Sequence, residues 1–148
     1  MDNIEMRSSK QIKLDKTYMS IAKQISNLSY CKRKKVGSII VKNNNILSFG
    51  YNGSPSNYIN KCEENNITHW YVLHAESNAI AKISRSTQSS EGATLYSTLS
   101  PCVECAKLII QSGIKEIIFS NWYKNININN KIITELFNSC NVKWRYER

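Results

Sequence analysis

The sequence predicts an α/β protein in three layers, in which a mixed sheet of about five strands lies between helices. Short β-rich runs alternate with helical stretches after an opening hairpin pattern, and such alternation builds a sheet with helices on both faces. The 148 residues contain no visible linker or internal repeat, and this length suits one domain with its own core. We therefore expect a single domain over residues 1–148.

The first elements are a helix and a hairpin. Apolar side chains recur at helical spacing over about 11–28, and a basic connection, 29–35, follows. Two β-rich runs, 36–41 and 46–50, then flank three asparagines at 43–45. Because asparagine tolerates the left-handed backbone of a tight turn, these runs predict a β-hairpin.

The rest of the chain alternates strand and helix after a long connection. An asparagine-rich polar loop runs to about residue 68, and so long a loop in a compact domain is usually functional or disordered. The later elements are a helix opening at His74, a strand at 93–98, a helix at 102–112 stopped by Gly113, a strand at 116–120, a helix around 130–138 and a last strand at 142–146.

The chain is strongly basic. It carries 20 Lys and Arg against 11 Asp and Glu, a net charge of +9. This excess suggests that phosphate takes part in the function. Nucleic acid, free nucleotides and simple solubility account for it equally well, and part of the bias follows if the genome is AT-rich.

Membrane and secretory classes are disfavoured. Apolar runs such as 117–119 are far shorter than a membrane span, and the polar start of the chain does not resemble a signal peptide. Five cysteines, an odd number, fit a reducing compartment better than a disulfide scaffold. We expect a cytoplasmic protein.

Metal-ligating residues gather in two motifs, His-Ala-Glu at 74–76 and Pro-Cys-Val-Glu-Cys at 101–105. Both motifs open predicted helices, and Cys102 and Cys105 share one face of a first turn, where free N–H groups favour thiolates. A structural zinc takes four protein ligands, so His74 with the two cysteines leaves the fourth position to water. Glu76 then remains free to carry protons. This order of motifs is the signature of zinc nucleobase deaminases.

Each motif alone has an ordinary explanation. H-x-E is common by chance as a polar helix start, and P-C-x-x-C also occurs as half of a structural zinc knuckle or as a redox pair. A closed structural zinc site that recruits Cys31 or Cys62 as its fourth ligand is the remaining alternative. Both motifs together, in this order and at helix starts, favour the catalytic site.

The chain resembles the deoxycytidylate (dCMP) deaminases of the cytidine deaminase superfamily over about 29–119. The resemblance rests on Ser-Tyr-Cys-Lys-Arg ahead of Val-Gly (29–37), Gly-Tyr-Asn-Gly-Ser-Pro (50–55), His-Ala-Glu-Ser-Asn-Ala-Ile (74–80) and Pro-Cys-Val-Glu-Cys-Ala-Lys (101–107). The last two segments look like the nucleotide enzymes rather than the branches that act on tRNA or single-stranded DNA.

This resemblance implies a cytidine deaminase-like fold and the hydrolytic conversion of dCMP to dUMP with release of ammonia. Water activated by Zn²⁺ would add to C4 while Glu76 protonates N3 and then passes a second proton to the departing amino group. By the same resemblance Asn52 would touch the sugar or base, and Arg33 and Tyr123 would hold the 5′-phosphate. Alternatively, Arg33 is a solvated charge in the basic run 32–35. Because this run is unusually basic, some activity on dCTP also stays open.

The resemblance also implies regulation. In the regulated members, the motif that is here Gly50, Tyr51, Asn52 and Gly53 belongs to a site where dCTP activates and dTTP inhibits a hexamer. Two glycines let backbone N–H groups approach a ligand and Tyr51 offers a stacking face, while the run 32–35 adds charge for a triphosphate with its Mg²⁺. The plainer alternative is a turn that only places Asn52 in the active site.

A second, structural zinc built from Cys31, Cys62 and His69 is a further hypothesis. These residues lie in two segments poor in apolar side chains, which need a tether, and some family members resemble this arrangement. The alternative, three unrelated polar-loop residues, is favoured two to one.

Two other functions stay open. A nucleic-acid editing deaminase would need exposed aromatics on which bases stack, and Trp122, Tyr123, Trp144 and Tyr146 are the candidates. Trp144 and Tyr146, however, share one side of a predicted strand, which favours packing.

A zinc-stabilised binding module is the non-enzyme alternative. The expected partners are dCMP, dCTP, dTTP and further copies of the chain in a hexamer, with neither nucleic acid nor membrane.

Overall fold

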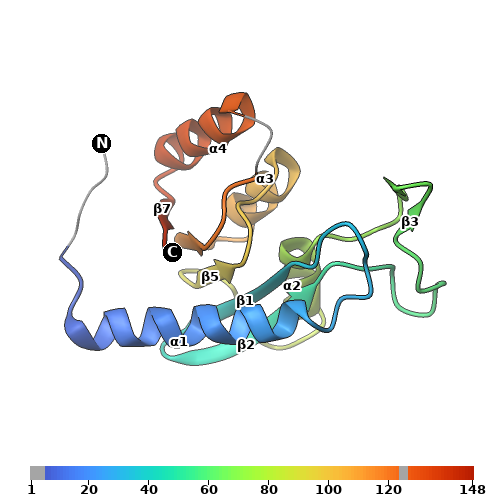
Figure 1. The fold of residues 1–148 in the computed structure, drawn as a ribbon. Coiled ribbons are helices and arrows are strands. Elements are labelled where there is room, and N and C mark those ends of the chain that lie inside the picture. Colours follow the sequence, from blue (N-terminus) through green and yellow to red (C-terminus); the bar gives the residue numbers. More distant parts are fainter. Residues whose placement is uncertain (1–5, 124–126) are drawn as a thin grey trace.

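The computed structural model describes residues 6–123 and 127–148, and it has the three layers expected from the sequence (Figure 1). The central sheet has five strands in the order β2-β1-β5-β6-β7. β1 pairs antiparallel with β2 and β5, whereas β5, β6 and β7 run parallel. The strands are β1 (Gly37–Lys42), β2 (Asn45–Tyr51), β5 (Thr94–Ser97), β6 (Glu116–Phe119) and β7 (Lys143–Tyr146). The mixed five-stranded sheet predicted from the sequence is confirmed.

Helices cover both faces of the sheet. One face packs on α1 (Ser9–Ser26) and the other on α2 (Ala75–Ser84), α3 (Val103–Gln111) and α4 (Asn127–Ser139). The strands alternate accordingly: Ile39 and Tyr96 are buried against α1, whereas Ile40 and Leu95 join the core under the other helices. Successive side chains of a strand point to opposite faces of the sheet. Since consecutive residues of β1 and β5 enter different cores, both faces of these central strands are apolar.

A buried ion pair anchors the start of α1 to the sheet. The Ser8 hydroxyl caps the helix by accepting the N–H of Gln11. One turn further, Asp15 is fully buried and pairs with Arg7 at 2.8 Å, while the Tyr96 hydroxyl donates to Asp15 over 2.6 Å. Arg7 also pairs with Glu116 of β6. The segment before α1 is therefore tied to two strands.

The β1–β2 hairpin turns where the sequence predicts. Asn43 and Asn44 both have positive φ, 50° and 60°, which is the backbone that a two-residue hairpin turn requires. The sequence therefore identified both the turn and its chemistry.

The long connection between β2 and α2 is more regular than expected. It contains a small hairpin of β3 (Glu63–Glu64) and β4 (Ile67–Thr68), again turned by two asparagines with positive φ, Asn65 and Asn66. The expectation of a loop without secondary structure is corrected here. Strands of two residues have no periodicity that a sequence pattern can reveal.

The remaining predicted elements lie where expected, with small shifts at their ends. The helix predicted at 102–112 is α3, which begins at Val103 with Cys102 as its cap. Trp144 packs against the rings of Phe119 and Trp122, as the packing interpretation predicted. Among the residues described, no helix combines the length and apolar character needed to cross a membrane.

Candidate active site

Two helix starts meet beyond the carboxyl end of β5. Cys102 caps α3, and its sulfur accepts the backbone N–H of Cys105 at 3.4 Å. His74 caps α2 with an extended backbone, and its ring makes no capping hydrogen bond. The free N–H groups of a helix start favour negative charge. Both cysteine sulfurs therefore lie where thiolates are stabilised.

The three groups are spaced for one metal ion. His74 Nδ1 lies 3.4 Å from Cys102 Sγ and 3.5 Å from Cys105 Sγ. A tetrahedral zinc with bonds of about 2.1 Å to nitrogen and about 2.3 Å to sulfur keeps these atoms about 3.6 Å apart. The donor set and its spacing thus fit zinc, and they leave a fourth position for a non-protein ligand. The fold therefore brings together the three residues that were predicted to bind zinc, His74, Cys102 and Cys105.

The ionisation of these groups supports metal binding. Through its hydrogen bond to Cys105, and through His74, the pKa of Cys102 falls to about 4. The same contact with Cys102 and burial raise the pKa of Cys105, so the two sulfurs share one charge within the protein alone. A hydrogen bond to Cys102 raises the pKa of His74. A dication would hold both sulfurs as thiolates and the imidazole neutral.

Glu76 lies beside this cluster and is not part of the ligand set. It is 4% exposed, and burial raises the pKa of its carboxyl group. The Ser97 hydroxyl donates to Glu76 Oε1 over 3.4 Å, and Ser38 in turn lies 3.1 Å from Ser97. A buried carboxyl with a raised pKa next to a metal site can both accept and return a proton near neutral pH.

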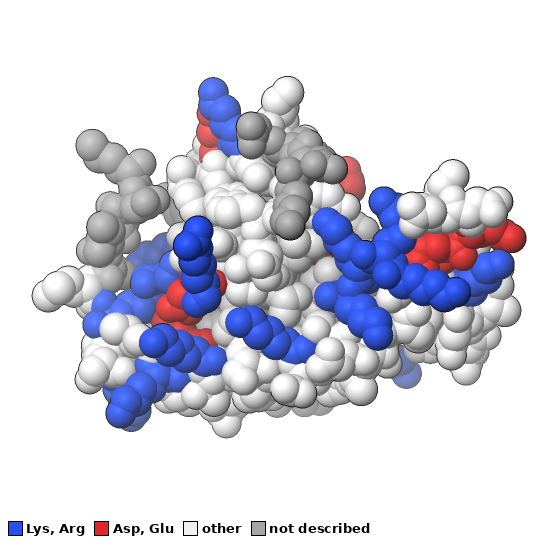
Figure 2. Space-filling model, viewed as in Figure 1, with Lys and Arg blue, Asp and Glu red and all other residues white. Residues whose placement is uncertain are grey.

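One pocket joins the zinc cluster to a basic wall. His74, Glu76 and Cys102 line it together with Arg33 and Lys34. Figure 2 shows basic side chains gathered over the loop between α1 and β1, beside acidic side chains of the β3–β4 hairpin. The pocket thus offers proton-transfer chemistry at one end and cationic side chains at the other.

The predicted substrate-binding residues all line this pocket. The Nζ atom of Lys34 lies 3.6 Å from the centre of the Tyr123 ring. Arg33 donates to the Thr68 hydroxyl at 3.2 Å. The side-chain amide of Asn52 is hydrogen-bonded to the backbone of the basic segment: it accepts from Val36 N at 2.9 Å and donates to Lys34 O at 2.8 Å. Its predicted contact with substrate stays a prediction.

The glycines of the 50–53 motif have a reason other than ligand approach. A Cβ at Gly50 would lie 2.3 Å from the Ala75 carbonyl oxygen, and one at Gly53 would lie 2.9 Å from the Tyr30 hydroxyl. Both glycines allow close packing within the chain, and their predicted role in the approach of a ligand stays a prediction. The regulatory role of Gly50, Tyr51, Asn52 and Gly53 stays a prediction.

Cys31 and Cys62 form a disulfide in this structure, a pairing that the odd number of cysteines did not predict. Neither sulfur of a disulfide is a thiolate that can bind zinc. The group nearest to them is Glu63, rather than the predicted His69, among the described residues that could ligate a metal. The second zinc therefore stays a prediction, which applies to the reduced chain.

Sequence reasoning missed three residues of the site: Ser97, Lys34 and Glu63. Ser97 ends a strand that was predicted to lead to Cys102, so its position could have suggested it. Lys34 was treated only as part of a basic run. Glu63 gave no signal, because its contacts are with backbone atoms 30 and 31 residues away.

Comparison with known proteins agrees with this geometry. Residues 12–121 match the sequence profile described as the cytidine and deoxycytidylate deaminase zinc-binding region. Deoxycytidylate deaminase of Enterobacteria phage T4 is 34% identical, over 72% of this chain and 77% of its own length. The Homo sapiens enzyme of the same name is 35% identical, over 86% and 76%.

A solved structure resembles the whole fold. The dCMP deaminase of cyanophage S-TIM5, in complex with dCMP and dUMP, superposes with a TM-score of 0.85 at 38% identity. The match covers 95% of this chain and 100% of that protein. At this identity the likeness extends to sequence as well as to fold.

Proposed function

The chain belongs to the family of cytidine and deoxycytidylate deaminases, and from this premise we propose that it hydrolyses dCMP to dUMP with release of ammonia. The observation that carries the proposal is a single pocket lined by the buried Glu76, by a cationic wall, and by His74 and Cys102, which cluster with Cys105. The cyanophage neighbour, which holds dCMP and dUMP, supports the choice of substrate.

Glu76 is the proton carrier in this proposal. Its carboxylate would take a proton from the attacking water and deliver it to N3 of the cytosine ring. It would then take the proton of the new C4 hydroxyl group and hand it to the departing amino group, so that C4 becomes a carbonyl and ammonia leaves. Burial, which raises the pKa of Glu76, suits a group that must be protonated and deprotonated in one cycle. The Ser97 hydroxyl holds Oε1 in place by donating to it.

His74, Cys102 and Cys105 would hold the zinc ion. When bound, zinc acts as a Lewis acid that lowers the pKa of water from about 15.7 to about 7. His74 and Cys102 line the pocket, so water and the base would reach the ion from the pocket.

The basic wall would receive the 5′-phosphate. Arg33 offers a planar fork of donors suited to phosphate oxygens, and Lys34 adds a second cation beside the Tyr123 ring. Whether the same wall accepts a triphosphate depends on the space beyond Arg33, and some turnover of dCTP belongs to this proposal.

Regulation by dCTP and dTTP with Mg²⁺, assembly into a hexamer and a cytoplasmic location complete the proposal. The regulatory part is supported by the position of Tyr51: its carbonyl accepts a hydrogen bond from Asn78 of α2 at 3.0 Å. That helix carries Glu76. A ligand bound beside Tyr51 would therefore contact a residue that is hydrogen-bonded to the helix carrying Glu76.

The test is turnover by the purified, zinc-loaded protein. Loss of cytosine absorbance and release of ammonia are measured with dCMP, dCTP, deoxycytidine, single-stranded DNA and tRNA. We expect dCMP to be the best substrate, with deoxycytidine much poorer because it lacks the phosphate. Turnover of DNA or tRNA without turnover of dCMP would reassign the protein to an editing enzyme. No turnover of any of them would favour a binding module.

The editing alternative has less support. Trp144 packs on Phe119 and Trp122, and Tyr146 contacts the same two rings. These aromatics therefore pack on one another at the end of the sheet, although Tyr146 remains 37% exposed. Of the four candidates, only Tyr123 lines the pocket.

A further inference from the structure

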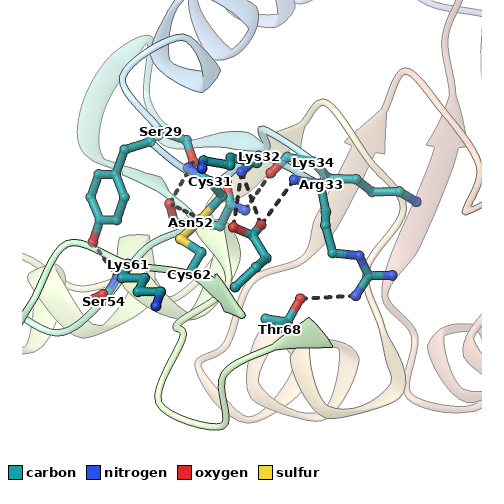
Figure 3. The surroundings of a disulfide bond; sticks show 12 residues. Ser29, Cys31, Lys32, Arg33, Lys34, Asn52, Ser54, Lys61, Cys62 and Thr68 are labelled. Atoms are coloured by element: carbon teal, nitrogen blue, oxygen red, sulfur yellow. Dashed lines mark hydrogen bonds between the residues drawn. A yellow bond between two sulfur atoms is a disulfide. The ribbon is translucent and has the colours of Figure 1, made fainter. Parts of the chain in front are cut away.

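Residues 31–36 form one wall of the pocket and belong to no helix or strand of the sheet before Gly37. Two clamps hold this wall. The Asn52 side chain bonds to the backbone of Lys34 and Val36 at one end. At the other end, the Cys31–Cys62 disulfide joins the wall to the start of the β3–β4 hairpin (Figure 3), and Glu63 of that hairpin accepts hydrogen bonds from the wall. The wall is therefore shaped by contacts from outside it.

Glu63 makes the most direct of these contacts. Its Oε1 accepts the backbone N–H groups of both Lys32 and Arg33 at 3.0 Å, and its Oε2 lies 3.2 Å from the same Lys32 nitrogen. Hydrogen bonds to a carboxylate are roughly twice as strong as those between neutral groups. One side chain thus fixes two consecutive peptide groups next to the pocket.

The same hairpin also steadies the Arg33 side chain. Arg33 Nη1 donates to the hydroxyl of Thr68 on β4 at 3.2 Å, so the backbone and the guanidinium of Arg33 are held from opposite strands of one hairpin (Figure 3). Cys62, the residue before Glu63, is bonded to Cys31, the residue before Lys32. Backbone, sulfur and side-chain contacts therefore act on the same three wall residues.

We propose that Glu63 is a positioning residue for the substrate phosphate: it holds the peptide groups of Lys32 and Arg33 so that Arg33 presents its guanidinium to the pocket. The inference rests on the proposed function, because it assigns the phosphate of dCMP to this wall. Glu63 itself does not touch the reacting atoms.

Whether substrate binding becomes stronger or weaker when Glu63 is neutralised separates this positioning role from simple charge repulsion. Glu63 lines the pocket, and a carboxylate near a phosphate repels it. If charge alone mattered, neutralising Glu63 would strengthen substrate binding. If Glu63 positions the wall, both changes weaken binding: Glu63→Gln leaves a neutral, weaker acceptor for the two N–H groups, and Glu63→Ala leaves them without this acceptor.

The experiment compares Glu63→Gln and Glu63→Ala with Glu64→Gln in the full-length, zinc-loaded protein. Glu64 is a matched control on the same strand, because its carboxylate faces Lys61 and His69 instead of the wall. For dCMP, we expect KM to rise about tenfold in Glu63→Ala and less in Glu63→Gln, which keeps one acceptor oxygen. The value of kcat should stay within about twofold, and Glu64→Gln should behave as wild type.

A double-mutant cycle with Arg33→Ala tests the route of the effect. Once Arg33 is gone, Glu63→Ala should change KM by less than about twofold, because the group that it positions is absent. Additive effects of the two substitutions would overturn the proposal. So would a KM that falls or stays constant in Glu63→Gln.

Amide hydrogen exchange gives a readout that does not depend on turnover. The Lys32 and Arg33 amides should be protected in wild type and exchange faster in Glu63→Ala, while Glu64→Gln leaves them protected. Equal exchange in all three proteins overturns the proposal even if dCMP is turned over. A wild type that is inactive on dCMP overturns the proposed function instead, and exchange then decides whether Glu63 holds the wall.

Discussion

His74 Nδ1 lies 3.4 Å from the sulfur of Cys102, although 28 residues separate them in the chain. The contact joins the starts of α2 and α3, since each residue caps its helix. Removing either group therefore affects a metal ligand and a helix start together.

His74→Ala or Cys102→Ala should lose zinc and stability in parallel. A structural element that depends on bound metal loses the binding free energy when a ligand is removed. We expect less than one zinc per chain by atomic absorption and a lower melting temperature than wild type, with Cys140→Ala as the control for a cysteine away from the site. A variant of His74 that keeps stoichiometric zinc would remove this residue from the ligand set.

Glu76→Gln should abolish deamination and leave zinc bound. The amide keeps the shape of the side chain but cannot accept and return a proton, and general acid–base roles contribute about 10²–10⁴-fold. The measurement pairs the rate of dCMP turnover with zinc content. Activity above about a hundredth of wild type would exclude Glu76 as the proton carrier.

The Arg7–Asp15 pair should be important for stability. Arg7→Ala leaves the fully buried Asp15 carboxylate with its bonds to Tyr96 and Gln11 but without a counter-ion. Removing one partner of a buried pair costs about 3 kcal/mol. Urea unfolding should show this loss, whereas Lys107→Ala, which breaks an exposed pair with Glu104, should cost less than about 1 kcal/mol. Similar losses in both variants would show that burial of Asp15 is unimportant.

The Cys31–Cys62 disulfide predicts how many free thiols and how many zinc ions each chain contains. In protein unfolded with chelator but without reductant, Cys102, Cys105 and Cys140 should react with a thiol reagent, and Cys31 and Cys62 should not. Native protein purified without chelator should then contain one zinc per chain. Reaction of all five cysteines together with two zinc ions per chain would establish the second site at Cys31 and Cys62.

The sequence anticipated the elements whose pattern is local. The Asn43-Asn44 turn, the β-rich runs that became β1 and β5, and the helix starts at His74 and Cys102 each depend on neighbouring residues, which propensity and spacing reveal. The cluster of metal-ligating residues could also be predicted, because the types of ligand and their order along the chain form a recognisable sequence pattern.

What the sequence did not reveal depends on contacts between distant segments. Glu63 binds the backbone of Lys32 and Arg33, and backbone acceptors and donors have no residue signature. Gly50 is required by the close approach of α2, a packing constraint that resembles a ligand-binding glycine when only the sequence is known. The zinc site could therefore be predicted, whereas the clamps on the pocket wall could not.

The regulatory hypothesis depends on Tyr51 and can be tested by one substitution. Tyr51 ends β2 next to α2: its carbonyl bonds to Asn78, and Lys82 Nζ lies 5.8 Å from the centre of its ring. A triphosphate that stacks on this ring would meet a cation and a helix that carries the catalytic carboxylate. We expect a sigmoidal dependence of rate on dCMP that dCTP makes hyperbolic and dTTP suppresses, with a coupling free energy of about 1–3 kcal/mol.

Tyr51→Ala should weaken both effects more than it weakens zinc binding, because it removes the ring and keeps the backbone bond to Asn78. Tyr51→Phe is the matched control, since it keeps the stacking face and loses only the hydroxyl. The measurements are initial rates with each triphosphate and sedimentation of the protein with and without them, where a hexamer is expected. Hyperbolic kinetics that neither triphosphate changes, in a protein that sediments as a monomer, would leave the 50–53 segment only its role of placing Asn52 at the pocket wall.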